Sequence, residues 1–554
     1  MRRLVLLIAA AALAAAEPVK GPLLSNDAWP RVTTLAEWTS DVMRVSGVER
    51  APETAQGKAF FEWLRLFSRM AVGGMIQAYE GEYGKERFVL DAHKTLFVYG
   101  WGYCDTSSRI AEAAWQEYKR DPAAAERVVV QHENGGYHTM YRLRLDGRYA
   151  AFDPRYGYYL VERDAPDARV LDWGEVAGNF ERNRKFRHRS RPFFEIGGIE
   201  WERALLLHPR YFETEDAWRT AGAPIEYVFG NRQYEMGTRF HDMDFVLLRG
   251  MTIERFWDSR ARQFYVPAGA HAKKELPFLP SGRFYRVTET SHGGNWPKWD
   301  PNHPRARAHL ADIPRGEGYP DDLAGGRPIG QAYGVMTYDA PLGKAGALDA
   351  VLPGATLVPV PDAPYLRPAG TAAGEAVFDF RLPYVLVDGT LNAVLAGAAD
   401  RVEFRVQLAK ARHAGEPDVW TDWQTLFHGH GSHRADLGRA RFNGRDASVH
   451  GAYRFQVRVR AAQGGGLSAL SLRLFFENNI MTVPPLFAGR NAMRFRATVA
   501  PEAPVEVVYR YDTAARGPDK RRHRLRPEDF VGQEARFSVD APGLVRCRSV
   551  SIRY

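Results

Sequence analysis

The chain has 554 residues, a mass of 62.4 kDa and a formal net charge of +9. This length exceeds what one hydrophobic core supports, so we expect three or four domains. A composition of 45% hydrophobic and 25% charged residues excludes a disordered chain. A charge of +9 spread over this length gives no argument for a nucleic-acid partner.

The N-terminus has the composition of an export signal. Arg2 and Arg3 precede an apolar run from Leu4 to Leu13, and small residues follow as far as Ala16. This is the arrangement of a secretory signal peptide, and the apolar run is too short for a membrane-spanning helix. Residues 1–16 therefore predict export to the periplasm or the extracellular space, without stable membrane insertion. A short N-terminal anchor is the alternative interpretation.

The next part of the chain is predicted to be an α+β domain over residues 17–192. The spacing of apolar side chains predicts a helix over 59–79, and 91–100 and 104–118 read as two further helices. Strands are then expected at 126–133 and 137–145. The dipeptide "DG" at 146–147 indicates a hairpin turn, with a return strand over 148–154.

Beyond residue 190 the sequence is dominated by alternating, β-branched segments separated by turn residues. This pattern predicts all-β sandwich or jelly-roll modules. We expect a β-rich middle domain over 193–355, a β-sandwich domain over 375–482 and a small C-terminal β domain over 484–554. The Pro- and Gly-rich stretch 352–375 is the predicted linker.

One of the two cysteines, Cys104, lies where the glycine-broken segment "VYGWGY" gives way to a helix. A helix N-terminus favours the thiolate, which is the nucleophilic form of cysteine. Such a nucleophile needs a base, and the base needs an orienting group. His138 opens the first strand of the hairpin and Asp153 ends the second. A turn at 146–147 sets these two residues nearly opposite each other.

The segments "GWGYCDTSSRIA" and "YHTMYRLRLDGRYAAFDP" resemble the catalytic core of transglutaminase-like cysteine enzymes, which have a papain-like fold. The resemblance covers roughly residues 95–160. It implies Cys104 as nucleophile, His138 as general base and acid, and Asp153 as the orienting carboxylate. It also implies an oxyanion hole formed by the Cys104 backbone N–H and an upstream side chain, Trp101 or Tyr103. The run "HTMYRL" departs from the family pattern after the histidine, which affects the substrate assignment more than the triad.

Each of these residues also has a structural interpretation. Cys104 could be a packed core thiol, since free cysteine is among the most buried residue types. His138 could be an ordinary strand histidine, and Asp153 a residue that ends a strand before Pro154. Cys547 alternates as a strand residue would and reads as inert core. The two cysteines are far apart in sequence, and we expect two free thiols rather than a disulfide.

Other segments carry weaker functional signals. Trp296 and Trp299 lie in a turn-rich loop and are candidate substrate contacts, because exposed indoles stack on sugar rings. The histidines of "FHGHGSH" and of the Trp loop match no strong ligand spacing, so no metal is expected. No cofactor motif stands in a supporting context. Two basic clusters, 182–191 and 520–526, read as solvated faces or as contacts for an acidic polymer, and nucleic acid is not expected as a partner.

The sequence thus predicts an exported cysteine hydrolase that acts on amide bonds through a thioester on Cys104. Its substrate would be a peptide, a cell-wall component or another glycan-containing molecule. Transamidation differs only in using an amine instead of water as acceptor, so the triad leaves it open. The alternative function is a non-catalytic carbohydrate- or cell-surface-binding protein built on the same scaffold. The sequence does not indicate an oligomeric state.

Overall fold

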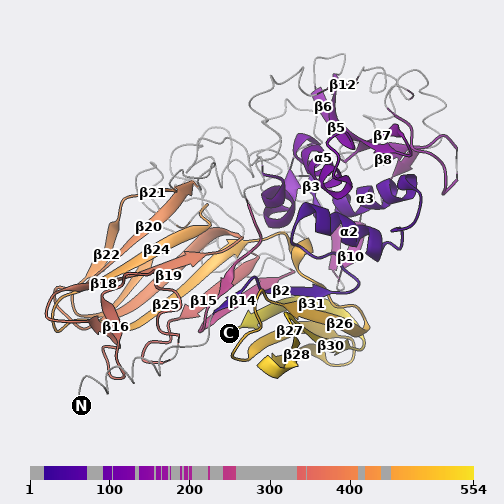
Figure 1. Cartoon of the computed structure of the whole chain (residues 1–554). Coiled ribbons are helices and arrows are strands. Elements are labelled where there is room, and N and C mark those ends of the chain that lie inside the picture. The colour runs from indigo at the N-terminus through magenta and orange to yellow at the C-terminus, as the bar shows by residue number, and fades with distance from the viewer. Residues whose placement is uncertain are drawn as a thin grey trace, which may run out of the picture.

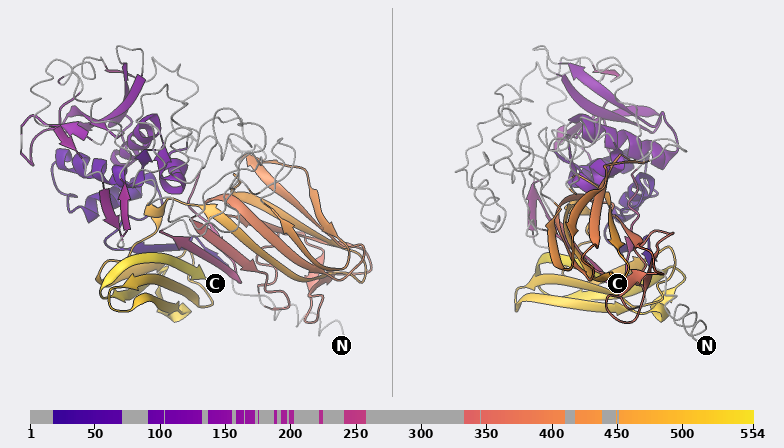
Figure 2. Two further views of the ribbon diagram at one scale, coloured as in Figure 1. Left: turned by 180° about the vertical axis from the view of Figure 1, so that it is seen from behind. Right: turned by 90° about the vertical axis from the view of Figure 1, so that its left-hand side faces the viewer.

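A computed structural model describes residues 18–70, 91–102, 104–131, 137–154, 158–163, 165–172, 175, 187–189, 193–196, 199–202, 222–224, 241–257, 333–344, 346–409, 418–437, 449 and 451–554. Figure 1 shows an N-terminal part with helices and a sheet, placed beside two β-rich parts. Figure 2 shows the same arrangement from behind and from the side. The chain is a β-rich multidomain protein, as the alternation of its sequence predicts.

The N-terminal part has an α+β architecture. Its helices pack on one face of a six-stranded sheet, in which the strand order is β12-β5-β6-β7-β8-β9. The helices are α2 (Leu35–Val45), α3 (Glu53–Phe67), the π-helix η1 (Lys94–Tyr99) and α5 (Cys104–Lys119). The sheet strands are β5 (Ala125–Gln131), β6 (Tyr137–Leu145), β7 (Arg148–Asp153), β8 (Tyr158–Leu160), β9 (Arg187–Arg189) and β12 (Gly222–Pro224).

Two short pairs of strands complete this part of the chain. The strands β3 (Arg69–Met70) and β4 (Trp101–Gly102) pair in parallel and bracket the segment that leads to Cys104. The strands β10 (Phe193–Ile196) and β11 (Ile199–Glu202) form an antiparallel hairpin.

The core of the N-terminal part is rich in aromatic side chains. Trp38 of α2, Phe60 of α3 and Trp115 of α5 are all completely buried, and Phe60 lies 5.8 Å and 5.2 Å from the two indoles. Tyr141 and Phe152 close the core from the sheet side, with their rings stacked at 5.5 Å. Burial of large rings stabilises this part, at roughly 25 cal/mol per Å² of apolar area.

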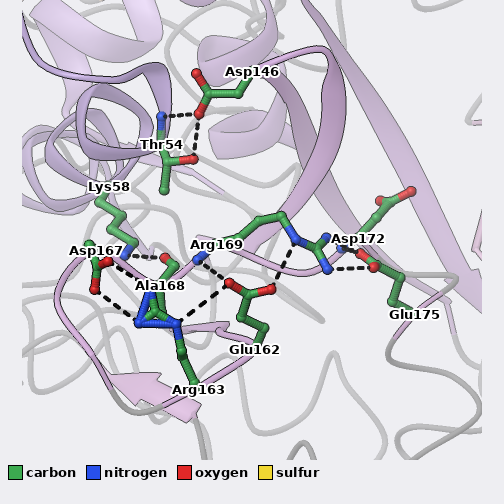
Figure 3. A network of polar contacts seen from close by, with 10 residues as sticks. All are labelled: Thr54, Lys58, Asp146, Glu162, Arg163, Asp167, Ala168, Arg169, Asp172 and Glu175. Atoms are coloured by element: carbon green, nitrogen blue, oxygen red, sulfur yellow. Dashed lines mark hydrogen bonds and ion pairs between the residues drawn. The ribbon is translucent and has the colours of Figure 1, made fainter.

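The helix predicted over 59–79 starts earlier, at Glu53, and ends at Phe67. Its start is set by a residue from the β6–β7 turn rather than by its own cap. The Asp146 carboxylate accepts hydrogen bonds from the Glu53 N–H at 3.3 Å, the Thr54 N–H at 3.2 Å and the Thr54 hydroxyl at 2.8 Å. Figure 3 shows Asp146 above Thr54. Sequence periodicity does not reveal this boundary, because the capping group comes from a distant turn.

A second polar network joins α3 to the loop after β8, also drawn in Figure 3. Lys58 Nζ donates to the Ala168 carbonyl at 2.6 Å. In the same loop Arg169 pairs with Glu162 and Glu175, and Arg163 pairs with Asp167. These ion pairs are largely exposed, so each adds little to stability. They order the loop internally, and Lys58 joins the loop to the helix.

The rest of the chain is built from antiparallel sheets. The largest is a ten-stranded sheet that contains β14 (Met251–Phe256), β15 (Gly334–Asp339), β16 (Leu357–Pro359), β17 (Leu366–Pro368), β19 (Val385–Leu395), β23 (Gly431–Asp436), β25 (Leu467–Glu477), β27 (Val505–Thr513), β28 (Gly517–Leu525) and β31 (Leu544–Arg553).

Two smaller sheets share one hydrophobic core with the ten-stranded sheet. One contains β18 (Gly374–Arg381), β20 (Arg401–Ala409), β21 (Val419–Trp420), β22 (Gln424–His428) and β24 (Arg454–Ala461). The other contains β2 (Leu23–Asn26), β26 (Gly489–Arg496), β29 (Phe530–Val531) and β30 (Glu534–Ala541). A further pair joins β1 (Val19–Lys20) to β13 (Val246–Leu247), and short 3₁₀ turns occupy η5 (Ile480–Thr482) and η6 (Pro527–Asp529).

The ten-stranded sheet runs across the predicted domain boundaries near 355 and 484. Its neighbours β25, β15, β14 and β31 come from all three predicted β domains. The stretch 352–375, predicted to be a linker, instead contains β16 and β17, which pair with each other and join β25. Proline and glycine mark turns at this position, and the turns lie within the sheet.

No helix within the described ranges is long and apolar enough to cross a membrane. The predicted signal peptide, residues 1–16, lies outside these ranges, as do Trp296 and Trp299.

Candidate functional site

The helix α5 begins at Cys104, as predicted. The π-helix η1 ends at Tyr99, and Gly100 caps it with a left-handed φ of 67° and donates its N–H to the Thr95 carbonyl at 2.9 Å. Two residues of β4 follow, and the chain then enters α5. Cys104 is partly exposed and is not in a disulfide. The backbone N–H groups of a first helical turn have no partners within the helix, so the thiol sits at the positive end of the helix.

The β6–β7 hairpin has the predicted register. Asp146 and Gly147 both have positive φ, 51° and 81°, which defines the tight turn expected from "DG". The pairs run from Leu145 with Arg148 to Tyr141 with Phe152. One further step along the ladder sets Met140 opposite Asp153, and His138 lies two residues earlier on β6. The backbone positions of His138 and Asp153 are therefore diagonal neighbours.

Asp153 is the last residue of β7 and is completely buried. The residue after it, Pro154, accepts a short hydrogen bond through its carbonyl from Nη1 of Arg65, a buried residue of α3. A long side chain from α3 thus holds the end of β7. The position of Asp153 is consequently fixed by both the sheet and the helix.

The N-terminal turns of α5 lie over the start of β6. Ser108 Oγ donates to the Thr139 carbonyl at 3.3 Å, and Ser107 Oγ is 2.8 Å from Ser68 Oγ. Ser108 follows Cys104 by about one helical turn, and Thr139 follows His138 directly. Cys104 therefore lies about one helical turn from a residue, Ser108, that bonds the direct neighbour of residue 138. The side chains of His138 and Trp101, and all of Tyr103, lie outside the described part of the chain.

A buried group of charges lies directly after Cys104. Arg127 of β5 donates from Nη1 to Asp105 at 2.9 Å and from Nε to Glu112 at 2.6 Å. Arg109 also pairs with Asp105. Two arginines thus balance the two carboxylates, and the Asp105 charge next to the thiol is compensated. Burial raises the pKa of the Glu112 carboxyl, and the Arg127 charge opposes this shift.

Sequence reasoning missed Asn479, which lies in the segment after β25. It is completely buried, and its Nδ2 donates to the Phe67 carbonyl at 2.8 Å and to the Leu96 carbonyl at 2.6 Å. Phe67 is the last residue of α3 and Leu96 lies within η1, the elements that precede β3 and β4. Ile480 and Met481 follow Asn479 into the N-terminal core. The β region therefore contributes a residue that ties together the two segments leading to Cys104.

The local sequence "ENNIM" contains the only signal that could have indicated this contact: a run of polar residues directly after an apolar strand. Such a run is typical of a turn, and its partners are hundreds of residues away. The contact depends on tertiary structure and could not be read from the pattern.

The second cysteine, Cys547, is a buried core residue of β31, as predicted. Burial raises the pKa of its thiol to about 12, and a weak hydrogen bond to the Leu486 carbonyl at 3.6 Å only partly opposes this. Both cysteines are free thiols, which confirms the expectation of no disulfide. Cys547 is therefore unsuited to nucleophilic chemistry.

Within the described ranges, no group of three or more His, Cys, Asp or Glu side chains could hold a metal ion. His433 belongs to the segment "FHGHGSH". It donates from Nε2 to the Gly429 carbonyl at 2.9 Å, and its ring stacks on Phe427.

No family model matches the chain, and no curated protein matches it. Among solved structures, β-glucuronidase 2 of Bacteroides uniformis is 12% identical with a TM-score of 0.12, over 31% of this chain and 22% of that chain. A glycosyl hydrolase family 2 member from Bacteroides cellulosilyticus is 9% identical with a TM-score of 0.12, over 44% and 29%. The β-glucuronidase of Parabacteroides merdae is 11% identical with a TM-score of 0.12, over 41% and 29%. The chain spans less than a third of the length of each enzyme, and similarity at this level carries no argument about function.

Proposed function

We propose that the chain is an exported transglutaminase-like cysteine hydrolase that cleaves amide bonds in a peptide, cell-wall or glycopeptide substrate. The observation that carries this proposal is the junction of α5 with the β6–β7 hairpin. Cys104 begins α5, Ser108 holds the next turn to Thr139, and the hairpin register sets His138 diagonal to Asp153. The three residues of the proposed triad come from these three elements.

The electrostatics of the helix terminus support Cys104 as the nucleophile. The N–H groups of the first turn have no acceptor within the helix, and their dipoles stabilise a thiolate. A free carboxylate at position 105 would oppose this effect, but Asp105 is paired with both Arg109 and Arg127. The helix terminus therefore keeps its positive character next to the thiol.

In the proposed reaction His138 takes the proton of the Cys104 thiol, and the sulfur attacks the carbonyl carbon of the amide. The developing oxyanion is stabilised by the Cys104 N–H and by Trp101 or Tyr103. The C–N bond then breaks, His138 gives its proton to the leaving amine, and a thioester remains. Water attacks the thioester while His138 accepts a proton, which releases the acid and restores the thiol. Asp153 orients the His138 imidazole throughout.

The acceptor in the second step is proposed to be water, because transamidation requires a groove that excludes water from the thioester. An amine acceptor would give an isopeptide product through the same intermediate. The two outcomes are separated by adding a primary amine to the assay and weighing the products by mass spectrometry.

The test is a panel of peptide, cell-wall and glycopeptide amides incubated with the wild type, Cys104→Ala and His138→Ala. Cys547→Ala is the matched control, because it removes the other thiol from a buried site remote from the chemistry. We expect turnover by the wild type and by Cys547→Ala, and a loss of about 10³-fold or more in Cys104→Ala. Turnover that survives Cys104→Ala would overturn the proposal. So would a Cys104 that resists iodoacetamide near pH 6 in a protein that turns over no substrate, which would favour the binding-protein alternative.

A further inference from the structure

A pocket of about 40 Å³ lies between the N-terminal segment, β14 and β31. Figure 1 shows β2, β14 and β31 next to one another where the N-terminal part meets the β region. The walls are part polar and part apolar, and the apolar part includes Leu24, Trp29, Phe245, Ile253 and Ile552. A water molecule needs roughly 10–15 Å³ of such space, so the pocket has room for about three waters or for a small organic group.

The pocket contains a buried cation, Arg255 of β14. Arg255 alternates with Met251 and Ile253 on the inward face of its strand, a position that otherwise carries core residues. Arg255 is buried, with 8% of the residue exposed. The guanidinium ion therefore lies among core residues, where solvent compensates its charge less than at the protein surface.

The hydrogen bonds that Arg255 forms with described residues all come from one nitrogen, Nη1, and their acceptors are uncharged. Nη1 donates to the Tyr384 hydroxyl at 3.0 Å and to the Thr482 carbonyl at 3.3 Å. The guanidinium carbon also lies 5.8 Å from the centre of the Tyr384 ring. Within the described ranges no carboxylate forms an ion pair with Arg255, and neither Nε nor Nη2 forms a hydrogen bond.

The other arginine in the pocket wall, Arg31, has a carboxylate partner. Its Nε lies 2.7 Å from Asp41 Oδ2, and its Nη2 lies 3.1 Å from Asp41 Oδ1. The charge of Arg31 is thereby compensated, so among the described lining residues Arg255 is the cation without a carboxylate partner.

We propose that this pocket binds the carboxylate of a small organic acid. The Nε–H and Nη2–H groups of a guanidinium form one edge with two parallel donors, which matches the two oxygens of a carboxylate. Among the described residues this edge of Arg255 has no acceptor, while Nη1 is anchored to Tyr384 and Thr482. The apolar part of the walls suits a short aliphatic body next to the carboxylate. The ligand class is therefore a short-chain carboxylic acid, or a larger molecule that ends in one.

The experiment compares sodium propionate with propionamide, which has nearly the same shape and no charge. Thermal unfolding of the full chain is followed at increasing ligand concentration, with ionic strength held constant by sodium chloride. We expect propionate to raise Tm of the wild type in a saturable manner, since a ligand that binds only the native state stabilises it. Propionamide should produce no saturable rise. Equal effects of the two compounds would overturn the proposal, without any variant being needed.

Variants then assign the effect to Arg255. In Arg255→Met the propionate-dependent rise should disappear, and in Arg255→Lys the apparent affinity should fall about tenfold because the paired donors are lost. Arg473→Met is the matched control, since it removes an exposed arginine from β25. A full propionate effect in either Arg255 variant, or its loss in Arg473→Met, would contradict the assignment. If Arg255→Met does not fold, Arg255→Lys and the comparison of the two compounds on the wild type still decide the matter.

A larger acid is distinguished from a free short one in the same assay. A tripeptide with a free C-terminal carboxylate and its C-terminal amide form a second matched pair. If the free-acid tripeptide stabilises the protein and its amide does not, the C-terminus of a peptide chain is an acceptable ligand as well as propionate. Stabilisation by propionate alone restricts the site to short acids.

Discussion

Asn479 packs directly against Gly100, the residue that caps η1. A Cβ atom on Gly100 would lie 2.3 Å from Cγ of Asn479, so only glycine fits there while Asn479 keeps its place. Gly100 also has a φ of 67°, which favours glycine independently. Asn479 comes from the β region and Gly100 from the segment leading to Cys104. The two residues connect the β sheets to the candidate nucleophile.

Replacing Asn479 is expected to disturb the approach to Cys104. Asn479→Ala leaves the Phe67 and Leu96 carbonyls buried without this donor, which costs about 1–3 kcal/mol of unfolding free energy. We also expect a change in the rate of Cys104 alkylation in the native state. Chemical denaturation measures the unfolding free energy, and mass spectrometry of iodoacetamide adducts measures the rate of Cys104 alkylation.

The control for Asn479→Ala is Asn491→Ala. Asn491 is also buried, and its Nδ2 also donates to backbone carbonyls, those of Phe487 and Gly489. It lies on β26, in the sheet remote from α5. We expect Asn491→Ala to lose a comparable amount of stability and to leave the rate of Cys104 alkylation unchanged. Equal alkylation rates in both variants would show that Asn479 has no special relation to Cys104.

The two thiols should differ sharply in reactivity. Burial raises the pKa of the Cys547 thiol to about 12, whereas Cys104 is partly exposed at a helix terminus. We expect iodoacetamide at neutral pH to label Cys104 alone in the native protein and both cysteines in denaturant. Peptide mapping by mass spectrometry checks this, and a Cys547 adduct in the native state is the contrary result.

Arg127 should be important for the stability of the α5–β5 contact. Arg127→Met leaves Glu112 and Asp105 without a main partner, and breaking a buried ion pair costs about 3–5 kcal/mol. Arg144→Met is the control, because the Arg144–Asp121 pair is exposed and should contribute about 1 kcal/mol or less. Urea denaturation of both variants measures the difference. Similar losses in the two would argue against a buried network.

Stability should fall below neutral pH because of His241. Burial, with a smaller contribution from the Lys94 charge, lowers the pKa of its imidazole well below 6.5. Neutral His241 donates from Nε2 to the Pro383 carbonyl at 2.9 Å, and its backbone N–H donates to Asp91 Oδ2 at 2.9 Å. The unfolded chain takes up a proton at this histidine near pH 6.5 and the native chain does not. The unfolding free energy therefore decreases as pH falls below about 6.5.

His241 changes the unfolding free energy by at most about 1.4 kcal/mol per pH unit, in the pH range between its unfolded and folded pKa values. His241→Gln should lower stability at pH 7 and flatten the curve between pH 7 and pH 5. His430→Gln, at an exposed turn position, should leave the slope unchanged. Denaturation midpoints across this range provide the measurement. A His241→Gln curve parallel to that of the wild type would contradict the prediction.

The β6–β7 turn should stabilise α3 through Asp146. Asp146→Ala removes the acceptor of the Glu53 and Thr54 N–H groups and should cost about 1 kcal/mol. Asp146→Asn keeps a side-chain oxygen and tolerates the left-handed φ of 51°, so it should cost less. Thermal denaturation ranks the two variants, and the reverse order would be evidence against capping by this turn.

The local features of this protein were determined by its sequence alone. The start of α5 at Cys104, the "DG" turn and the register of the β6–β7 hairpin all follow from short-range steric and hydrogen-bonding rules. The alternation that predicts β sheets after residue 190 is equally local, since it reflects which face of a strand is buried. The inert, buried state of Cys547 followed from the same alternation.

Tertiary structure alone decided which distant residues meet. The stretch 352–375 has the composition of a linker, but β16 and β17 within it pair into the ten-stranded sheet. Asp146 caps a helix far from it in sequence, and Asn479 enters the core of another part of the chain. Arg255 occupies an inward position that alternation assigns to an apolar residue. Each of these depends on long-range packing, which a pattern of neighbouring residues does not encode.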